Sequence, residues 1–187
     1  MTSNPTRYDT GTIILHWLTA VLVLVLFTTA LAWDYFPRES GMKQILEPLH
    51  VSLGILLAAT IAARIPWRLT LGRHLPRAGS GLVSVASRIV HGALYGLLVL
   101  QIGLGFVLRW LQGDALAFFG LFSIPSPLEA SRELSRIFEG AHNFVAWTLL
   151  ILVGGHAIAA LIHHHFLRDG VLLRMFPNTG GAIQNRR

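Results

Sequence analysis

The chain has 187 residues, of which 53% are hydrophobic and only 13% charged, and its mean hydropathy is +0.57. A soluble domain carries roughly 25% charged residues, so the composition predicts an integral membrane protein with no room for a separate soluble domain. The absence of cysteine excludes disulfides, iron–sulfur clusters and thioether-linked c-type haem, and histidine becomes the main candidate ligand for any redox cofactor.

Four apolar stretches are long enough to cross a bilayer as helices, which requires about 20 residues each. The first contains His16 and ends in a small-residue pattern that imitates a signal peptide. It is too long for a signal sequence, however, so we expect it to remain as a membrane helix. We predict an all-α four-transmembrane-helix bundle that forms one domain over residues 1–187. The predicted spans cover about residues 13–33, 47–67, 86–110 and 138–164.

The basic residues are distributed unevenly between the two ends of the predicted bundle. Ten lie in or near the N-terminal arm, the loop between the second and third spans, and the C-terminal tail: Arg7, Arg64, Arg68, Arg73, Arg77, Arg88, Arg168, Arg174, Arg186 and Arg187. The other end holds Arg38, Lys43, Arg109, Arg132 and Arg136. Since basic loops stay in the cytoplasm, both termini are predicted to be cytoplasmic. The pI of 11.0 then reflects membrane topology and not nucleic-acid binding.

Four histidines lie at two depths within the predicted spans. His16 is near the cytoplasmic side, whereas His50 and His142 begin spans at the opposite side. His156 follows His142 by 14 residues, about 21 Å deeper along a helix and rotated only about 40° from it. Depth therefore pairs His16 with His156 and His50 with His142. One helix supplies a ligand at each depth, and two other helices supply the partners.

Two stacked pairs of imidazoles suit two non-covalent b-type haems, because haem iron accepts two axial histidines and bundle interiors commonly hold such cofactors. A single membrane histidine can also be an interhelical hydrogen-bonding residue. Four that pair by depth and by helix face favour ligation of haem iron. We therefore predict His16, His50, His142 and His156 as the axial ligands.

The chain also resembles the bacterial cytochrome b561 family along nearly its whole length. The resemblance rests on His16-Trp17, the stretch His50-Val51-Ser52-Leu53-Gly54, the His91…Tyr95 element, His142, and the segment from His156 through HHHFLRDGVLLRMFP. It implies a multi-pass protein of the bacterial inner membrane with two b haems on the same four histidines. Family members include membrane-bound superoxide oxidase. The resemblance thus implies superoxide oxidation at the periplasmic face and reduction of ubiquinone by electrons that reach the cytoplasmic side.

Several further residues are candidates for the quinone end. His163, His164 and His165 are consecutive, so on a helix they point about 100° apart and cannot converge on one metal ion. His163 and His91 are candidate quinone-site residues, or alternatively interfacial histidines in contact with water. Arg64, Arg68 and Arg88 are candidate partners of haem propionates, because guanidinium groups bind carboxylates bidentately; they equally suit a topology signal. No further catalytic residue is predicted.

Two other functions remain open from the sequence. The chain could be a cytochrome b subunit that passes electrons from a hydrogenase or dehydrogenase partner to quinone. The five basic and seven acidic residues of the outer end give it a net charge of −2, which argues against strong attraction of superoxide unless basic residues gather locally, whereas the short outer loops slightly favour a self-contained enzyme. A histidine-relay ion transporter is less favoured, because no acidic residue lies within a span core.

Overall fold

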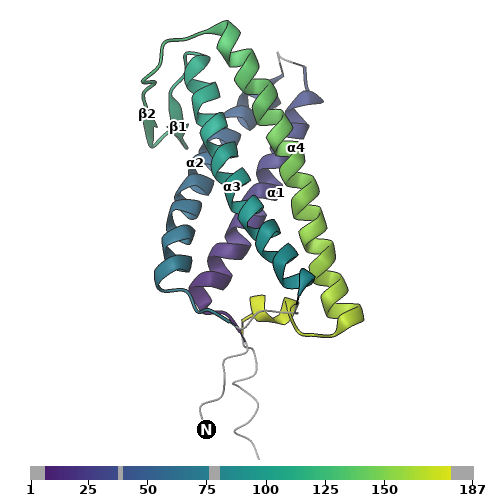
Figure 1. Ribbon diagram of the computed structural model, residues 1–187. Helices are drawn as coiled ribbons and strands as arrows, with labels where there is room; N and C mark the ends of the chain where they lie inside the picture. The colour runs from purple at the N-terminus through teal and green to yellow at the C-terminus, as the bar shows by residue number, and fades with distance from the viewer. Residues whose placement is uncertain (1–6, 38–39, 76–80, 178–187) are drawn as a thin grey trace, which may run out of the picture.

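The structure is a computed structural model that describes residues 7–37, 40–75 and 81–177. Four long helices form one bundle (Figure 1), and all four are long and apolar enough to cross a membrane. This confirms the predicted four-helix membrane fold, and each predicted span lies within one helical segment. The helices are α1 (Thr10–Asp34), α2 (Gly41–Thr70), α3 (Leu82–Leu111) and α4 (Arg132–Ile162), and α4 continues into a π-helical turn, η1 (His163–Leu167).

Local sequence explains where the helices begin. Asp9 caps α1, because its carboxylate accepts a hydrogen bond from the Thr12 backbone N–H. Ser131 caps α4 in the same way through the N–H of Leu134. Asp9 also accepts from the Trp67 indole and the Arg73 backbone N–H. One carboxylate therefore joins the start of α1 to the end of α2.

The helices pack chiefly as two pairs, α1 with α2 and α3 with α4. A small core forms at mid-bundle between the depths of the two predicted histidine pairs. It contains buried apolar residues from all four helices: Leu22, Leu26, Leu57, Ile61, Leu98, Val145 and Leu149. Many other large apolar side chains remain exposed on the helix surfaces, as expected for a bundle that faces lipid.

A β-hairpin, which the sequence did not predict, covers one end of the bundle. Strands β1 (Leu116–Phe118) and β2 (Phe122–Ile124) pair antiparallel, and Phe119 and Gly120 both have positive φ at the turn. The hairpin packs on α2, where the Ser52 hydroxyl accepts a hydrogen bond from the Phe119 N–H and contacts the Ala117 carbonyl. The hairpin is thus attached to α2 at Ser52, two residues after His50 in the sequence.

The two ends of the described chain meet at the opposite end of the bundle (Figure 1). After a short 3-10 helix, η2 (Leu172–Met175), the chain returns beneath α1. Arg7 donates to the carbonyls of Phe176 and Pro177, and the Trp17 indole donates to the carbonyl of Met175. The C-terminal segment is therefore held against α1 at Trp17, the residue that follows His16.

Candidate functional site

The inner histidine level, at the end of the bundle where the chain ends meet, brings together residues from all four helices. The ring centres of His16 and His156 are 6.4 Å apart. Two imidazoles that bind one metal ion from opposite sides, with each nitrogen about 2 Å from it, place their ring centres roughly 6 Å apart. His91 of α3 packs against His156 at 5.3 Å, edge to face. The predicted pair of His16 and His156 is therefore adjacent, with His91 beside it.

Arg64 of α2 places a positive charge at this level. Its guanidinium donates a hydrogen bond to His16 Nδ1 over 2.9 Å and lies 5.2 Å from the centre of the Tyr95 ring. It is also close enough to His91 and His156 for its charge to act on both. If His16 Nδ1 accepts this bond, the neutral ring carries its proton on Nε2. Coordination through Nε2 then requires Arg64 to leave His16 for another acceptor, such as a propionate carboxylate.

The outer histidine level lies beside the hairpin. The Thr29 hydroxyl is buried and donates to the Leu26 carbonyl, so its oxygen remains free to accept. It lies 3.1 Å from His50 Nδ1, which therefore carries the proton and donates to Thr29. This hydrogen bond leaves the lone pair of His50 Nε2 available to a metal ion, the arrangement expected of a metal-binding histidine. Trp33 packs on the same ring at 5.1 Å.

His142 of α4 is the second histidine at the outer level, close enough to His50 for electrostatic interaction. One ring nitrogen lies 3.0 Å from the side-chain amide of Gln101, while the other, Nδ1, is buried without a partner among the described residues. An unpartnered buried nitrogen is costly. Gly105 packs against the same ring, where an added Cβ would lie 3.0 Å from His142 Cε1. The ring is thus held closely. Because the Gln101 amide nitrogen is a donor, His142 Nε2 accepts this bond and the neutral ring carries its proton on Nδ1, so coordination of a metal through Nε2 requires the Gln101 amide to turn away from the ring.

These observations fit a haem at each level. Each level offers two imidazoles from different helices, and at the outer level the Nε2 lone pair of His50 is free to bind a metal ion. A Cβ on Gly54, one turn after His50, would meet no atom of the described residues within 4 Å, which is compatible with a flat group beside that helix face. Within residues 7–37, 40–75 and 81–177, no three histidine or carboxylate side chains converge on one metal ion.

The other predicted arginines have different surroundings. Arg68 donates to the Arg73 carbonyl and lies 4.9 Å from the centre of the Tyr8 ring, so it contributes to the structure of the inner end. Its charge still reaches His91. Arg88 is exposed on the first turns of α3. Of the three candidates for propionate binding, the structure brings only Arg64 into contact with a predicted ligand.

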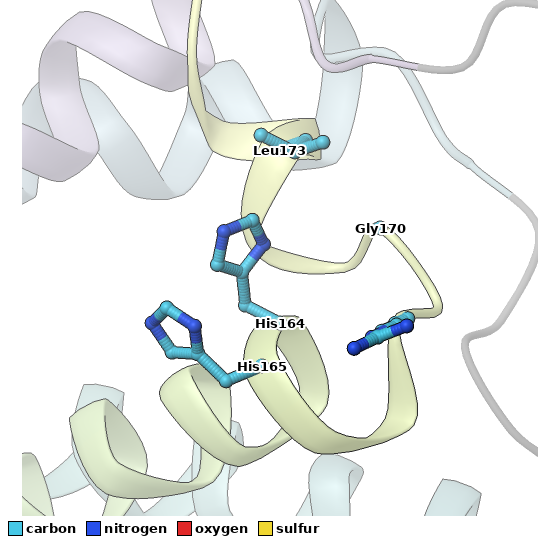
Figure 2. Close-up of a pocket in the computed structure, with 5 residues that line it drawn as sticks. His164, His165, Gly170 and Leu173 are labelled. Atoms are coloured by element: carbon cyan, nitrogen blue, oxygen red, sulfur yellow. The ribbon is translucent and has the colours of Figure 1, made fainter.

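The three consecutive histidines do not converge on one point, although the rings of His164 and His165 lie 4.8 Å apart. His163 Nδ1 pairs with the Asp169 carboxylate at 2.5 Å, whereas His164 and His165 line a separate pocket at the end of α4 (Figure 2). Burial opposes ionisation of Asp169, but the hydrogen bonds from His163 and the Val171 N–H together outweigh it and hold the pKa of its carboxyl below the usual value. Asp169 therefore stays ionised beside His163 at neutral pH.

Sequence reasoning missed the residues that orient the outer histidines. Thr29 and Gln101 are polar groups within long apolar runs, where such groups usually have a partner. That placement was the available signal for both. Gly105 carried no such signal, because its importance depends on which face of α3 meets His142.

Comparisons with known proteins agree over almost the whole chain. The model of the family described as prokaryotic cytochrome b561 matches residues 7–178. Cytochrome b561 homolog 2 of Escherichia coli K12 is 33% identical over 93% of this chain and 93% of its own length. Probable superoxide oxidase CybB of Yersinia pestis is 27% identical over 94% of this chain and 98% of its own length. Cytochrome b562 of Cereibacter sphaeroides is 29% identical, also over 94% and 98%.

Proposed function

The chain belongs to the prokaryotic cytochrome b561 family, and from this premise we propose that it is a di-haem superoxide:quinone oxidoreductase. Membership makes it a b-type haem protein that transfers electrons in a bacterial membrane. The presence of imidazole pairs at two depths supports the number of haems. The similarity to a probable superoxide oxidase supports the choice of electron donor.

Each proposed haem has an assigned set of protein groups. His16 and His156 would hold the inner group, with Arg64 free to bind a propionate once it leaves His16. His50, oriented by Thr29, and His142, once the Gln101 amide turns away from its ring, would hold the outer group. Bound between two imidazoles, a b-type haem takes up and releases one electron at a time.

The proposed reaction connects the two faces of the membrane. Two superoxide ions at the periplasmic face lose one electron each and become two molecules of dioxygen. One quinone takes up both electrons and two protons and becomes a quinol. Both described chain ends lie at the inner histidine level, so the excess of basic residues there supports a cytoplasmic location for both termini and for the quinone end, in the bacterial inner membrane.

His163 is the proposed proton donor at the quinone end. Its Nδ1 is held by Asp169, and its other ring nitrogen, Nε2, can face a quinone oxygen. The Asp169 carboxylate fixes the orientation of the ring through Nδ1, which leaves Nε2 to pass a proton from the cytoplasm to a quinone oxygen. His91, which is exposed and adjacent to His156, is the second candidate for this role.

One observation favours a second function, electron transfer from a hydrogenase or dehydrogenase subunit to quinone. Arg109 at the outer end is paired with Glu47 and Asp114, so its charge is neutralised locally. Arg132 and Arg136 are exposed at the start of α4, and Arg38 lies outside the described residues. Lys43 also lies at this end, but so do Glu129, Glu133 and Glu139, so the described outer end has no excess of positive charge to attract superoxide. A redox partner protein would not need it.

The test is superoxide-driven quinol formation by purified protein in liposomes that contain ubiquinone. The proposal predicts turnover by the wild type, loss of turnover in His142→Ala, and full turnover in His74→Ala, which changes an exposed histidine outside the helices. Equal rates in the wild type and His142→Ala would contradict the proposed route. A wild type that contains haem, does not respond to superoxide and co-purifies with a hydrogenase or dehydrogenase subunit would support the second function.

A further inference from the structure

A pocket at the end of the fourth span belongs to neither histidine level. It has a volume of about 400 Å³ and is lined by His164, His165, Arg168, Gly170 and Leu173. In Figure 2 the His164 ring lies between His165 and Leu173. The volume is within the range of about 300–1,000 Å³ that is typical of small-molecule sites. The pocket is therefore large enough for a small charged group such as a phosphodiester.

The chemistry of the lining favours an anion. Both imidazoles and the guanidinium are hydrogen-bond donors, and no carboxylate lines the pocket. The nearest acid in sequence, Asp169, is occupied by His163 and by the N–H of Val171. The carbonyl of His163 at the helix end accepts from the backbone N–H of Arg168. The Asp169 carboxylate and the His163 carbonyl, two negative groups at the end of α4, thus already have partners.

Arg168 adopts an unusual backbone conformation. Its φ of 52° and ψ of 32° are left-handed, at a helix-capping position where glycine is the favoured residue. A side chain there is unfavourable, because the Cβ approaches the following carbonyl oxygen. An arginine at this position therefore has a local cost, and a bound anion would offset it.

The surroundings of the pocket indicate where the anion would come from. Apolar side chains on the last turns before the pocket are exposed, and all of them lie within the apolar helix that spans the membrane: Leu161, Ile162, Phe166 and Leu167. Basic pockets at the ends of membrane helices bind anionic lipid head groups. We propose that His164, His165 and Arg168 bind the phosphate of an anionic membrane lipid whose acyl chains lie along these apolar side chains.

The lipid preference of the full-length protein tests this proposal. The purified protein would be exchanged into nanodiscs that contain equal amounts of phosphatidylglycerol and phosphatidylcholine, and the retained lipid would be measured by native mass spectrometry. We expect the wild type to retain phosphatidylglycerol preferentially. Arg168→Gly should lower that preference roughly fivefold, the weight of one basic residue at an anionic surface, without loss of folding, because glycine suits the left-handed backbone. Arg136→Gln, which removes an exposed charge at the other end of α4, should retain the wild-type preference.

Each other result has a clear meaning. No preference in the wild type, or an equal preference in the wild type and Arg168→Gly, would overturn the proposal. A wild type that binds inorganic phosphate by calorimetry but shows no lipid preference would identify a site for free phosphate and would contradict the lipid assignment. A double variant, His164→Gln with His165→Gln, provides a second test and should also reduce the preference. Haem content measured on each variant separates loss of binding from loss of folding.

Discussion

Replacement of Thr29 by valine should weaken the outer haem site while the inner site stays intact. Valine has nearly the same shape as threonine but cannot accept the hydrogen bond from His50 Nδ1–H, which spans 3.1 Å to a buried hydroxyl. A buried donor without a partner costs about 1–3 kcal/mol. Loss of such a partner typically lowers metal affinity about 10- to 100-fold. We therefore expect the haem affinity of the outer site to fall about 10- to 100-fold, while the affinity of the inner site stays unchanged.

Titration of haem into the apoprotein, followed by absorbance, measures both affinities. Thr60→Val is the matched control, because Thr60 is also buried and donates only to the Leu56 carbonyl of its own helix. The control should bind haem as the wild type does. Unchanged binding by Thr29→Val would refute the assignment of the proton to His50 Nδ1. Equal weakening in both variants would mean that the effect arises from helix packing and not from His50.

Three further predictions concern packing and charge. Gly105→Ala should displace His142 and reduce the haem content of the outer level, since the new Cβ would lie 3.0 Å from the ring. Gly103→Ala is the control and should retain the wild-type haem content, because a Cβ there would meet no atom of the described residues within 4 Å. Burial opposes ionisation of Asp9, but its hydrogen bonds hold its pKa below the usual value. The ionised Asp9 therefore stabilises the fold fully above about pH 4, the pKa of an aspartate in the unfolded chain, and this stabilisation is lost as the pH falls toward the lower pKa of the folded state. The difference in Tm between the wild type and Asp9→Asn should consequently narrow in acid. Ser52→Ala, at a side chain that is 2% exposed, should release the hairpin and increase proteolysis within it, while an unchanged digestion pattern would contradict the role of this hydroxyl.

The sequence allowed the helices and the depth of the four histidines to be predicted, because both depend on distances along one chain. Long apolar runs define membrane helices, and 14 residues on one helix relate His142 to His156 in depth and rotation without knowledge of any other helix. The structure has α4 as one unbroken helix from residue 132 to 162, as this reasoning requires.

Contacts between helices were harder to predict. The positions of Thr29 against His50, and of His91 against His156, depend on how each helix is rotated about its axis. Sequence periodicity does not determine that rotation when most helix faces are apolar. The hairpin was missed for a different reason, since each strand has only three residues and the alternation of residue types is too short to recognise.

Haem content per chain tests the central claim most directly. A pyridine haemochrome assay on detergent-purified protein should give two b haems for the wild type and for the His74→Ala control. It should give one haem or none for His156→Ala. Two haems in His156→Ala, or no haem in wild-type protein that is well folded, would contradict the assignment of the four histidines as two pairs of axial ligands.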